Sequence, residues 1–508
     1  MLKKIFSIVL VAMLLCLAAI PAAFAADTST ASVGAGNVSF TLDCSKPDYT
    51  FTVYKVADYV QSDSNPYGTK YNSLVSDVSS AILNGNQTAY INTVQNTNSA
   101  PALLTALDAS NLTGATTVGT YNSTTDGASK QFTGLDKGVY YVKATNYPAG
   151  VKKVTNSVFA LPYYDGTAWV NTIPAINLAN KVVEDTVTIK KTITNPTQGN
   201  ENFTDGGLGD TVNFKLVSDT AGSNDMPLNS YVVTDTMSAG LTYTTKTIAV
   251  QLQKEDGTKV KDLAATDYTV TTTGGNGSET VIKVALNPST VLAANSDFYG
   301  ADTKKVAITY SATINKYAVT GKAGNPNTAT DITYTNKNDV SSTVPGNTVY
   351  VYTYTATVNK TDENNTALAG AKFTLYDSTG TTVIGTGTST SSGLVAFTKT
   401  NGDAVKLAPG SYIIRETEAP TGYNRYAEDI TVTVNPTYET SYNATTGTWV
   451  KTEANEQGTW TSTVKNSKTI LPATGGAGEM WIYIVAGIVA LAAAGAFVIS
   501  RRKARASK

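Results

Sequence analysis

The chain has 508 residues, enough for about three domains at the usual size of ~150 residues each. It carries 38 basic and 39 acidic residues, and this balance gives no indication of a nucleic-acid partner. Histidine is absent. Because histidine is the commonest general base and metal ligand, Ser-His-Asp catalysis is excluded, and neither a metal ion nor a cofactor is expected.

Residues 1–26 have the pattern of a secretory signal peptide. Two lysines precede an apolar run, and an Ala-Phe-Ala motif suited to cleavage ends at residue 25. Cys16 lies in this leader, so Cys44 has no partner in the mature chain. An intramolecular disulfide is therefore not expected, and Cys44 is expected to be a small buried apolar residue.

The region after the leader is rich in Thr, Val, Tyr, Asn and Gly, with short alternating runs separated by turns such as KEDGTK and TGGNGS. This pattern predicts an all-β chain of tandem immunoglobulin-like sandwiches. Between residues 71 and 109, apolar positions spaced by three and four predict a helical or irregular insertion. The expected exterior domains are 27–180, 181–348 and 349–468.

The sequence also contains an internal repeat. GVYYVKATNYPAG (138–150) aligns without a gap with GSYIIRETEAPTG (410–422), and FTVYKV (51–56) corresponds to FTLYDS (373–378). The first and third exterior domains are therefore predicted to be copies of one sandwich.

A lysine is predicted on the inner face of the third domain. In the strand-like stretch TYTATVNKTD, Lys360 is in phase with the apolar Ala356 and Val358. A buried ammonium costs several kcal/mol unless it is paired or loses its proton. Glu416 and Asn466 also fall on inward faces of their strands, and all three would meet if the first and last strands are neighbours.

These three residue types can form a covalent bond without a cofactor. Burial lowers the pKa of an amine and raises that of a carboxylic acid, which favours the neutral pair. The amine can then attack the asparagine amide carbon while the acid binds its oxygen and relays a proton, and ammonia leaves. We expect a Lys360–Asn466 isopeptide bond with Glu416 as the catalytic acid.

The middle domain offers a similar set. Lys191 is in phase with Ile189 and Ile193, whereas Lys190 falls among threonines. Asp235 is in phase with the apolar residues of its strand and is the candidate acid. Periodicity leaves the partner amide open among three asparagines of one segment: Asn325, Asn327 and Asn336.

The first domain lacks the reactive groups. In the gapless alignment, Val38 stands where Lys360 stands, and Ala144 stands where Glu416 stands. We therefore predict no cross-link in this domain.

The C-terminal region, residues 469–508, has three parts. A short motif comes first, and an apolar stretch at 480–500 follows it, long enough for a transmembrane helix across ~30 Å of hydrocarbon. The basic tail RRKARASK would stay in the cytoplasm. The motif consists of Leu471, Pro472, Ala473, Thr474 and Gly475.

This arrangement resembles the sorting signal of Gram-positive surface proteins, which a sortase cleaves between the residues matching Thr474 and Gly475. The whole chain resembles a backbone pilin of sortase-assembled pili, with CnaB-type sandwiches. RETEAPTGY (415–423) resembles the E-box of that family and carries Glu416, and LAGAKFTLYD (368–377) resembles the opening of its CnaB-type domain.

The resemblance also bears on the middle domain. VVTDTMSAGLTY is similar to the family motif whose catalytic aspartate matches Asp235, and the family's Asn-x-Ala element favours Asn327. One departure concerns polymerisation, because Trp169 is not followed by the family's Tyr-Pro-Lys. Lys181 is the nearest candidate for the inter-subunit lysine.

The resemblance implies a structural subunit rather than an enzyme, with a role in adhesion. Its partners would be pilin-type and housekeeping sortases, further copies of the chain in a covalent polymer, and peptidoglycan at the cell surface. The adhesion ligand would lie on a host or bacterial surface. The alternatives are a monomeric wall-anchored adhesin or a basal or minor pilin, in which Lys181 has no role. A hydrolase is disfavoured because the acids are scattered over turns.

Overall fold

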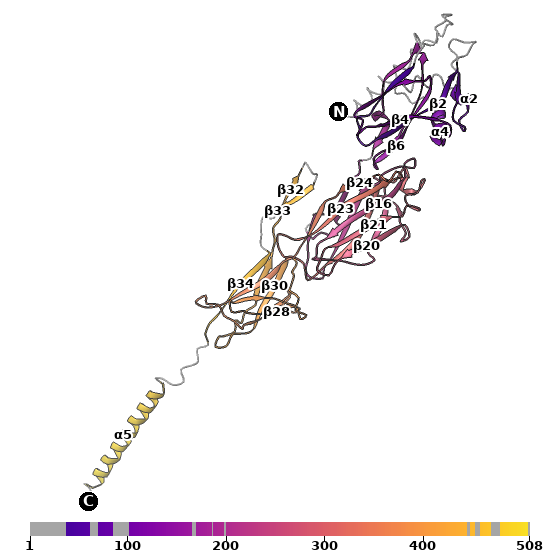
Figure 1. Ribbon diagram of the computed structural model, residues 1–508. Helices are drawn as coiled ribbons and strands as arrows, with labels where there is room; N and C mark the ends of the chain where they lie inside the picture. Colours follow the sequence, from indigo (N-terminus) through magenta and orange to yellow (C-terminus); the bar gives the residue numbers. More distant parts are fainter. Residues whose placement is uncertain are drawn as a thin grey trace, which may run out of the picture.

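The computed structural model describes most of the exterior chain, and the predicted all-β fold is confirmed. Figure 1 shows three β-rich domains following one another along the chain. The predicted leader lies outside the described residues, as does the LPATG motif. The described ranges are 37–60, 70–84, 101–164, 169–184, 186–197, 200–443, 448–452, 458–468 and 478–505.

The first domain packs a sheet of order β11-β1-β5 against a sheet of order β3-β2-β6-β8, in which β4 also pairs with β2. In the described part of the predicted insertion, the short helices α2 and α4 follow strand β3. The elements are β1 Val38–Asp43, β2 Thr50–Val60, β3 Lys70–Ser73, α2 Ser80–Asn84, α4 Pro101–Ala109, β4 Thr116–Asn122, β5 Ser129–Leu135, β6 Gly138–Asn146, β7 Val151–Val154, β8 Ser157–Leu161, β9 Tyr163–Tyr164, β10 Trp169–Val170, β11 Thr172–Asn177, η3 Ala179–Lys181 and β12 Val182–Glu184.

The middle domain is a larger sandwich. One sheet has the order β13-β15-β22-β18-β19, and the facing sheet has the order β14-β25-β23-β16-β21-β20. Alternate residues of their strands, such as Val212, Phe214 and Leu216, are buried between the sheets. The elements are β13 Ile189–Ile193, β14 Phe203–Asp205, β15 Thr211–Asp219, β16 Leu228–Met237, β17 Leu241–Tyr243, β18 Ala249–Gln253, β19 Lys259–Asp262, β20 Tyr268–Gly274, β21 Thr280–Leu286, η4 Asp297–Tyr299, β22 Lys305–Ile314, β23 Asn325–Asn336, β24 Ser341–Pro345 and β25 Thr348–Tyr352.

The C-terminal domain packs a sheet of order β29-β26-β34 against a sheet of order β28-β27-β30-β31. A separate hairpin, β32–β33, stands out from it (Figure 1). The elements are β26 Thr355–Asp362, β27 Lys372–Tyr376, β28 Val383–Thr388, β29 Leu394–Ala396, β30 Gly410–Glu418, β31 Ile430–Val434, β32 Glu439–Asn443, β33 Thr448–Thr452 and β34 Thr459–Asn466.

The first and C-terminal domains share one topology, as the internal repeat predicts. In both, the first strand lies between the last strand, which runs parallel to it, and an antiparallel strand: β11-β1-β5 corresponds to β34-β26-β29. The registers also agree, because Phe51 pairs with Ala144 and Phe373 pairs with Glu416. Equivalent residues of the two domains can therefore be compared directly.

The first and middle domains each extend slightly beyond the boundary predicted from the sequence, because one further strand pairs with strands of each domain. Strand β12, which follows Lys181, pairs with β7 of the first domain. Strand β25, which starts at Thr348, pairs with β23 and β14 of the middle domain. Sheet membership depends on pairing with strands that are distant in sequence, and composition does not report such pairing.

A buried polar cluster joins the middle and C-terminal domains. The hydroxyl of Tyr354 donates to Asp205 Oδ1 at 2.7 Å and lies 2.6 Å from the Tyr438 hydroxyl, which also donates to Asp205. The ring of Phe203, two residues before this aspartate, packs at 4.8 Å from the ring of Tyr438. Strand β14 of the middle domain thus extends into the core of its neighbour.

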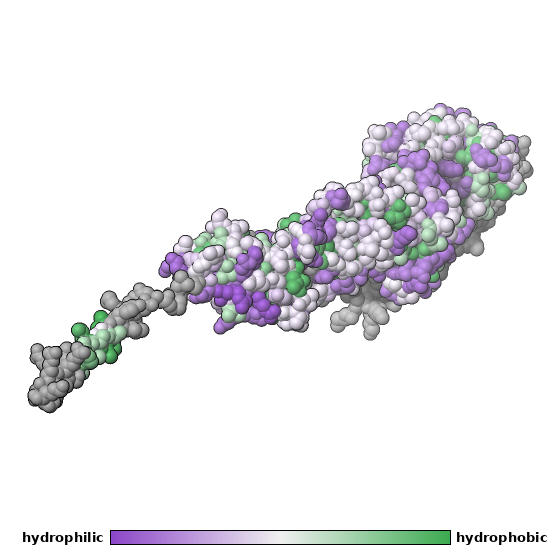
Figure 2. All heavy atoms as spheres, turned by 90° about the horizontal axis from the view of Figure 1, so that it is seen from below, coloured by the Kyte–Doolittle hydropathy of each residue, from purple (hydrophilic) through white to green (hydrophobic). Residues whose placement is uncertain are grey.

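The helix expected at 480–500 is present as α5, Gly478–Arg505. Its described apolar side chains, including Leu491 and Phe497, are exposed and form the green area beside the grey segments in Figure 2. Within the part of the chain that the structure describes, no helix is long and apolar enough to cross a membrane.

Candidate functional site

The middle domain buries one lysine of the pair on strand β13. Along this strand, Ile189, Lys191 and Ile193 point into the core, because side chains alternate between the faces of a sheet. Lys191 is 0% exposed. Its neighbour Lys190 points outward and forms an ion pair of 2.5 Å with Glu201. The choice of Lys191 made from periodicity therefore matches the packing.

Lys191 contacts the two residues expected to react with it. Its Nζ atom donates to Asp235 Oδ1 and lies 2.7 Å from Asn327 Oδ1. All three side chains are buried. The structure thus brings together the amine, the acid and the amide that the sequence singled out.

The three residues come from facing sheets. Lys191 extends from β13 at the edge of one sheet, whereas Asp235 and Asn327 lie on the paired strands β16 and β23 of the other. Met237 pairs with Asn327 and Ala329 pairs with Asp235, so the acid and the amide are diagonal neighbours on one face. A bond from Lys191 to Asn327 would join the sheets through the core.

Burial changes the proton affinity of this lysine. It lowers the pKa of Lys191 to about 8, although the Asp235 carboxylate opposes the shift. The Nζ atom also lies 5.1 Å from the ring centre of Phe214. Apart from Asp235, the amine is thus surrounded by neutral and aromatic groups, where loss of its proton costs less than in water.

The other two candidate asparagines are occupied elsewhere. The Asn325 amide nitrogen donates to the main-chain oxygens of Val319 and Val351 at 3.1 and 3.0 Å. Asn336 donates to the main-chain oxygen of Tyr147 in the first domain at 2.7 Å. Contact with Lys191 therefore favours Asn327, the residue that the family resemblance selects.

Sequence reasoning missed Tyr310. Its hydroxyl lies 3.0 Å from Lys191 Nζ and 2.7 Å from Asn327 Nδ2, and it donates to Asp235 Oδ2. A signal was present, because Tyr310 is in phase with the buried Ile308 and Ala312 on strand β22. A buried tyrosine hydroxyl needs a polar partner, which is a reason to test it against the cluster.

In the C-terminal domain, Lys360 and Asn466 lie on the neighbouring strands β26 and β34, whereas Glu416 lies on β30 of the facing sheet. Strands β26 and β34 pair in parallel, as expected for the first and last strands, and Lys360 is opposite Val464. The amide nitrogen of Asn466 donates to Glu416 Oε1 at 2.9 Å. The other carboxyl oxygen, Oε2, accepts from the main-chain nitrogen of Tyr426 at 2.5 Å.

Lys360 is 0% exposed, but its amine binds the main chain beside the amide. Nζ donates to the carbonyl oxygens of Val464 and Thr361 at 3.0 and 3.1 Å. Asn466 Oδ1 has no hydrogen-bond partner among the described residues. Burial lowers the pKa of Lys360, and Glu416 opposes that shift. The structure thus joins the acid and the amide directly and leaves the amide oxygen open.

The first domain has apolar side chains at all three equivalent places. Val38 and Ala144 replace the lysine and the acid, as the alignment indicates. In the C-terminal domain, Asn466 pairs with Asp362, whose equivalent in the first domain is Phe40. Phe40 pairs with Ile173, so Ile173 occupies the place of the amide. Val38 and Ile173 are fully buried. The first domain therefore has neither an amine, an acid nor an amide at these three places, and the lack of a cross-link there stays a prediction.

Lys181, the candidate inter-subunit lysine, lies in the short helix η3 just before β12. It is 9% exposed, and burial lowers its pKa. Its main-chain oxygen accepts from Thr155 of the first domain at 2.8 Å. The residue is thus part of the first domain rather than of a free linker.

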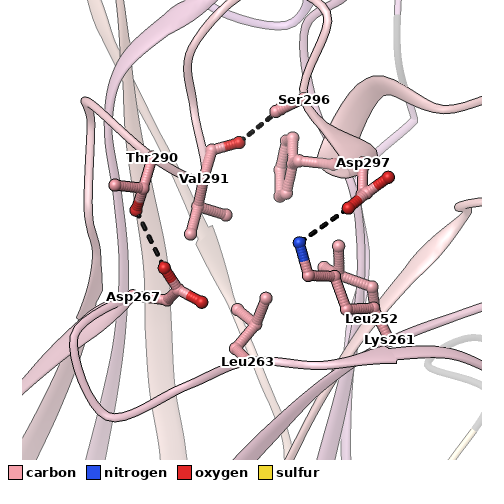
Figure 3. A pocket seen from close by; sticks show the side chains of 9 residues that line it. Leu252, Lys261, Leu263, Asp267, Thr290, Val291, Ser296 and Asp297 are labelled. Atoms are coloured by element: carbon pink, nitrogen blue, oxygen red, sulfur yellow. Dashed lines mark hydrogen bonds and ion pairs between the residues drawn. The ribbon is translucent and has the colours of Figure 1, made fainter.

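One hollow in the middle domain lies apart from these clusters (Figure 3). Its volume is about 200 Å3, and its acids are already engaged: Asp267 accepts from Thr290 at 3.0 Å, and Asp297 pairs with Lys261 at 2.7 Å. Within the described ranges, no group of three or more His, Cys, Asp or Glu side chains is placed to hold a metal ion. Because its acids are already engaged by neighbouring side chains, this hollow has no evident functional role.

Two segments of the chain match known families. Residues 354–448 match the SpaA prealbumin-like fold domain, and residues 463–504 match the LPXTG cell wall anchor motif. The first match includes Lys360 and Glu416, and the second includes Asn466. The chain is therefore a surface protein with a cell wall anchor at its C-terminal end.

A curated relative is the trypsin-resistant surface T6 protein of Streptococcus pyogenes serotype M6, which is 26% identical over 283 residues. The match covers 52% of this chain and 47% of the relative, so the chain spans about half the length of the curated relative it matches.

Two solved structures extend the comparison. The T6 backbone pilin of serotype M6 S. pyogenes, described as a modular three-domain structure, matches 86% of this chain and 100% of its own, with 16% identity and a TM-score of 0.51. The full-length major pilin SpaD of Corynebacterium diphtheriae covers 86% and 98%, with 16% identity and a TM-score of 0.41. The likeness to the T6 pilin shows a shared fold.

Proposed function

We infer that this chain, a wall-anchored relative of the sortase-assembled major pilins, is the subunit that builds a pilus shaft. The observation that carries this proposal is the buried Lys191–Asp235–Asn327 cluster, which can close a covalent bond between the two sheets of a domain. Such bonds suit a protein that is pulled from its ends. The likeness to pilins supports the same conclusion.

The cross-linking chemistry follows from the contacts. A proton passes from Lys191 to Asp235, and the neutral amine attacks the amide carbon of Asn327. The attacking nitrogen then gives up a second proton, the bond from the amide carbon to Nδ2 breaks, and ammonia leaves with one proton supplied by the acid. The product is one amide bond, with the surplus proton released. Glu416 would serve Lys360 and Asn466 in the same way.

These bonds lie where tension acts. In the C-terminal domain, Lys360 and Asn466 stand on the first and last strands, β26 and β34, through which a pull on the chain enters and leaves. In the middle domain, Lys191 is on the first strand and Asn327 is near the end. A cross-link would carry the load past the intervening strands, so the domain would not extend.

Polymerisation would use two groups that are far apart in the chain. A sortase would cleave after Thr474 and transfer the resulting acyl group to Lys181 of another copy. Lys181 is nearly buried, so helix η3 must open locally before its amine can react. We expect the finished polymer to be joined to peptidoglycan through Thr474 of its basal subunit, whose acyl group is not transferred to a lysine.

The experiment that tests this function is an immunoblot of cell wall extracts boiled in detergent. Wild-type cells should give a ladder of covalent multimers, and Lys181→Ala should abolish it while leaving the wall-anchored monomer. Lys153→Ala is the matched control, because Lys153 is an exposed lysine on β7, the partner strand of β12. A wild-type extract without a ladder would instead support the wall-anchored monomer, and a ladder that persists in Lys181→Ala would exclude this lysine.

A further inference from the structure

Tyr310 is the one residue of the middle-domain cluster to which the reaction above gives no role. Its hydroxyl oxygen lies 3.0 Å from Lys191 Nζ and 2.7 Å from Asn327 Nδ2, and its proton is donated to Asp235 Oδ2. The hydroxyl therefore touches the attacking nitrogen, the leaving nitrogen and the acid. A neutral hydroxyl can donate once and accept twice, so these contacts use its full capacity.

In the C-terminal domain, the acid contacts the leaving nitrogen without a tyrosine between them. There, Glu416 Oε1 accepts directly from the leaving nitrogen of Asn466 at 2.9 Å. Asp235 is one methylene shorter than a glutamate, and its Oδ2 atom is bound to Tyr310 instead. In the middle domain, the tyrosine hydroxyl stands between the acid and the leaving nitrogen.

We propose that Tyr310 is a catalytic residue of the middle-domain cross-link, relaying the proton from Asp235 to the leaving nitrogen of Asn327. The proposal rests on the proposed isopeptide bond between Lys191 and Asn327. Before the attack, Lys191 gives its first proton to the Tyr310 oxygen, and the hydroxyl proton moves to Asp235 Oδ2. As the bond from the amide carbon to Nδ2 breaks, the Tyr310 proton moves to Nδ2 and the Oδ2 proton returns to the tyrosine oxygen. The second proton of the attacking nitrogen passes to Asp235 Oδ1, so the tyrosine is restored, the acid stays protonated and ammonia leaves.

The surroundings keep this hydroxyl protonated. Burial and the adjacent Asp235 carboxylate raise the pKa of Tyr310 well above its ordinary value. A relay group must hold its proton until the leaving nitrogen becomes basic, and then receive another at once. The tetrahedral intermediate supplies such a nitrogen, because its lone pair is no longer conjugated with a carbonyl group.

The test follows cross-link formation in full-length chains made by cell-free synthesis, where the time since translation is known. Mass spectrometry measures the branched peptide that contains Lys191 and Asn327, and the Lys360–Asn466 peptide of the same molecules is the internal reference. General acid catalysis typically contributes about 10²–10⁴-fold, so Tyr310→Phe should slow the first bond by at least ~10²-fold and leave the second unchanged. Tyr243→Phe is the matched control, since its ring packs edge-to-face on that of Tyr310 at 6.1 Å.

A second variant separates catalysis from loss of structure. Adding Asp235→Glu to Tyr310→Phe supplies a longer acid that can reach Asn327 Nδ2 directly, as Glu416 reaches Asn466. Recovery of the bond in the double variant supports the relay. Formation of the bond at the wild-type rate in Tyr310→Phe overturns it, and so does a slow single variant that Asp235→Glu does not restore. A wild-type chain without the Lys191–Asn327 peptide would overturn the proposed cross-link itself.

Discussion

The Lys191→Met chain is expected to keep the ammonia that the proposed Lys191–Asn327 cross-link would release from the wild-type chain. The deficit between its measured intact mass and the mass calculated from its sequence should be smaller by one ammonia than the deficit of the wild type. The unfolding free energy of the domain should fall by about 5 kcal/mol, because the entropy model for a cross-link closing a separation of 136 residues gives that value. The loss of a partner for the buried Asp235 adds to this effect.

Lys190→Met is the control for this variant. Lys190 occupies the next position on β13 but is exposed, and its ion pair with Glu201 is of the surface type, which contributes little to stability. We expect its mass deficit and its urea midpoint to equal those of the wild type. If Lys191→Met showed the wild-type mass deficit, the bond would have to involve another lysine. Asn327→Ala should reproduce the mass change while keeping the contact between Lys191 and Asp235.

The second large effect is expected from Lys360→Met in the C-terminal domain. Without the bond to Asn466, strands β26 and β34 are held by hydrogen bonds and packing alone. Loss of the constraint costs about 5 kcal/mol by the same model, since the separation is 106 residues, obtained as 466 minus 360. The domain should therefore become sensitive to trypsin, and the mass should increase by one ammonia.

Lys372→Met provides the comparison within that domain. Lys372 lies on β27 with its side chain exposed, where it pairs with Glu418 at 2.6 Å. This variant also loses one trypsin site, but it keeps the proposed bond and should stay resistant. Protection of the Lys360→Met chain equal to that of Lys372→Met, with an unchanged mass deficit, would contradict the assignment of Lys360. A double variant that combines Lys360→Met with Lys191→Met should show no mass deficit, because no cross-link is expected in the first domain.

Several features followed from local pattern alone. The period-two alternation of β13 separates Lys191 from Lys190, because neighbouring side chains on a strand face opposite sides of the sheet. The repeat between the first and third exterior domains fixes the equivalence of Ala144 and Glu416, which the strand pairing reproduces. The sorting motif around Thr474 is contiguous and can be read without a fold. Each of these features depends on residues that are close in sequence or related by a gapless alignment.

Other features needed the family resemblance or the fold. Periodicity alone could not choose among Asn325, Asn327 and Asn336, since all three are buried. The polar contacts of each amide separate them, and those contacts depend on which main-chain groups lie opposite. The environment of Lys181 also depends on the fold, because its burial in η3 against the first domain results from tertiary packing.

The amino-acid sequence by itself determined which chemical groups this protein has and which side of its own strand each group faces. The tertiary structure decided which of those groups meet. Lys191, Asp235, Tyr310 and Asn327 come from four strands in two facing sheets, and sheet order and register place them within hydrogen-bond reach. A one-residue slip in register would turn any of these side chains to the opposite face, and strand periodicity carries no information about register between distant strands.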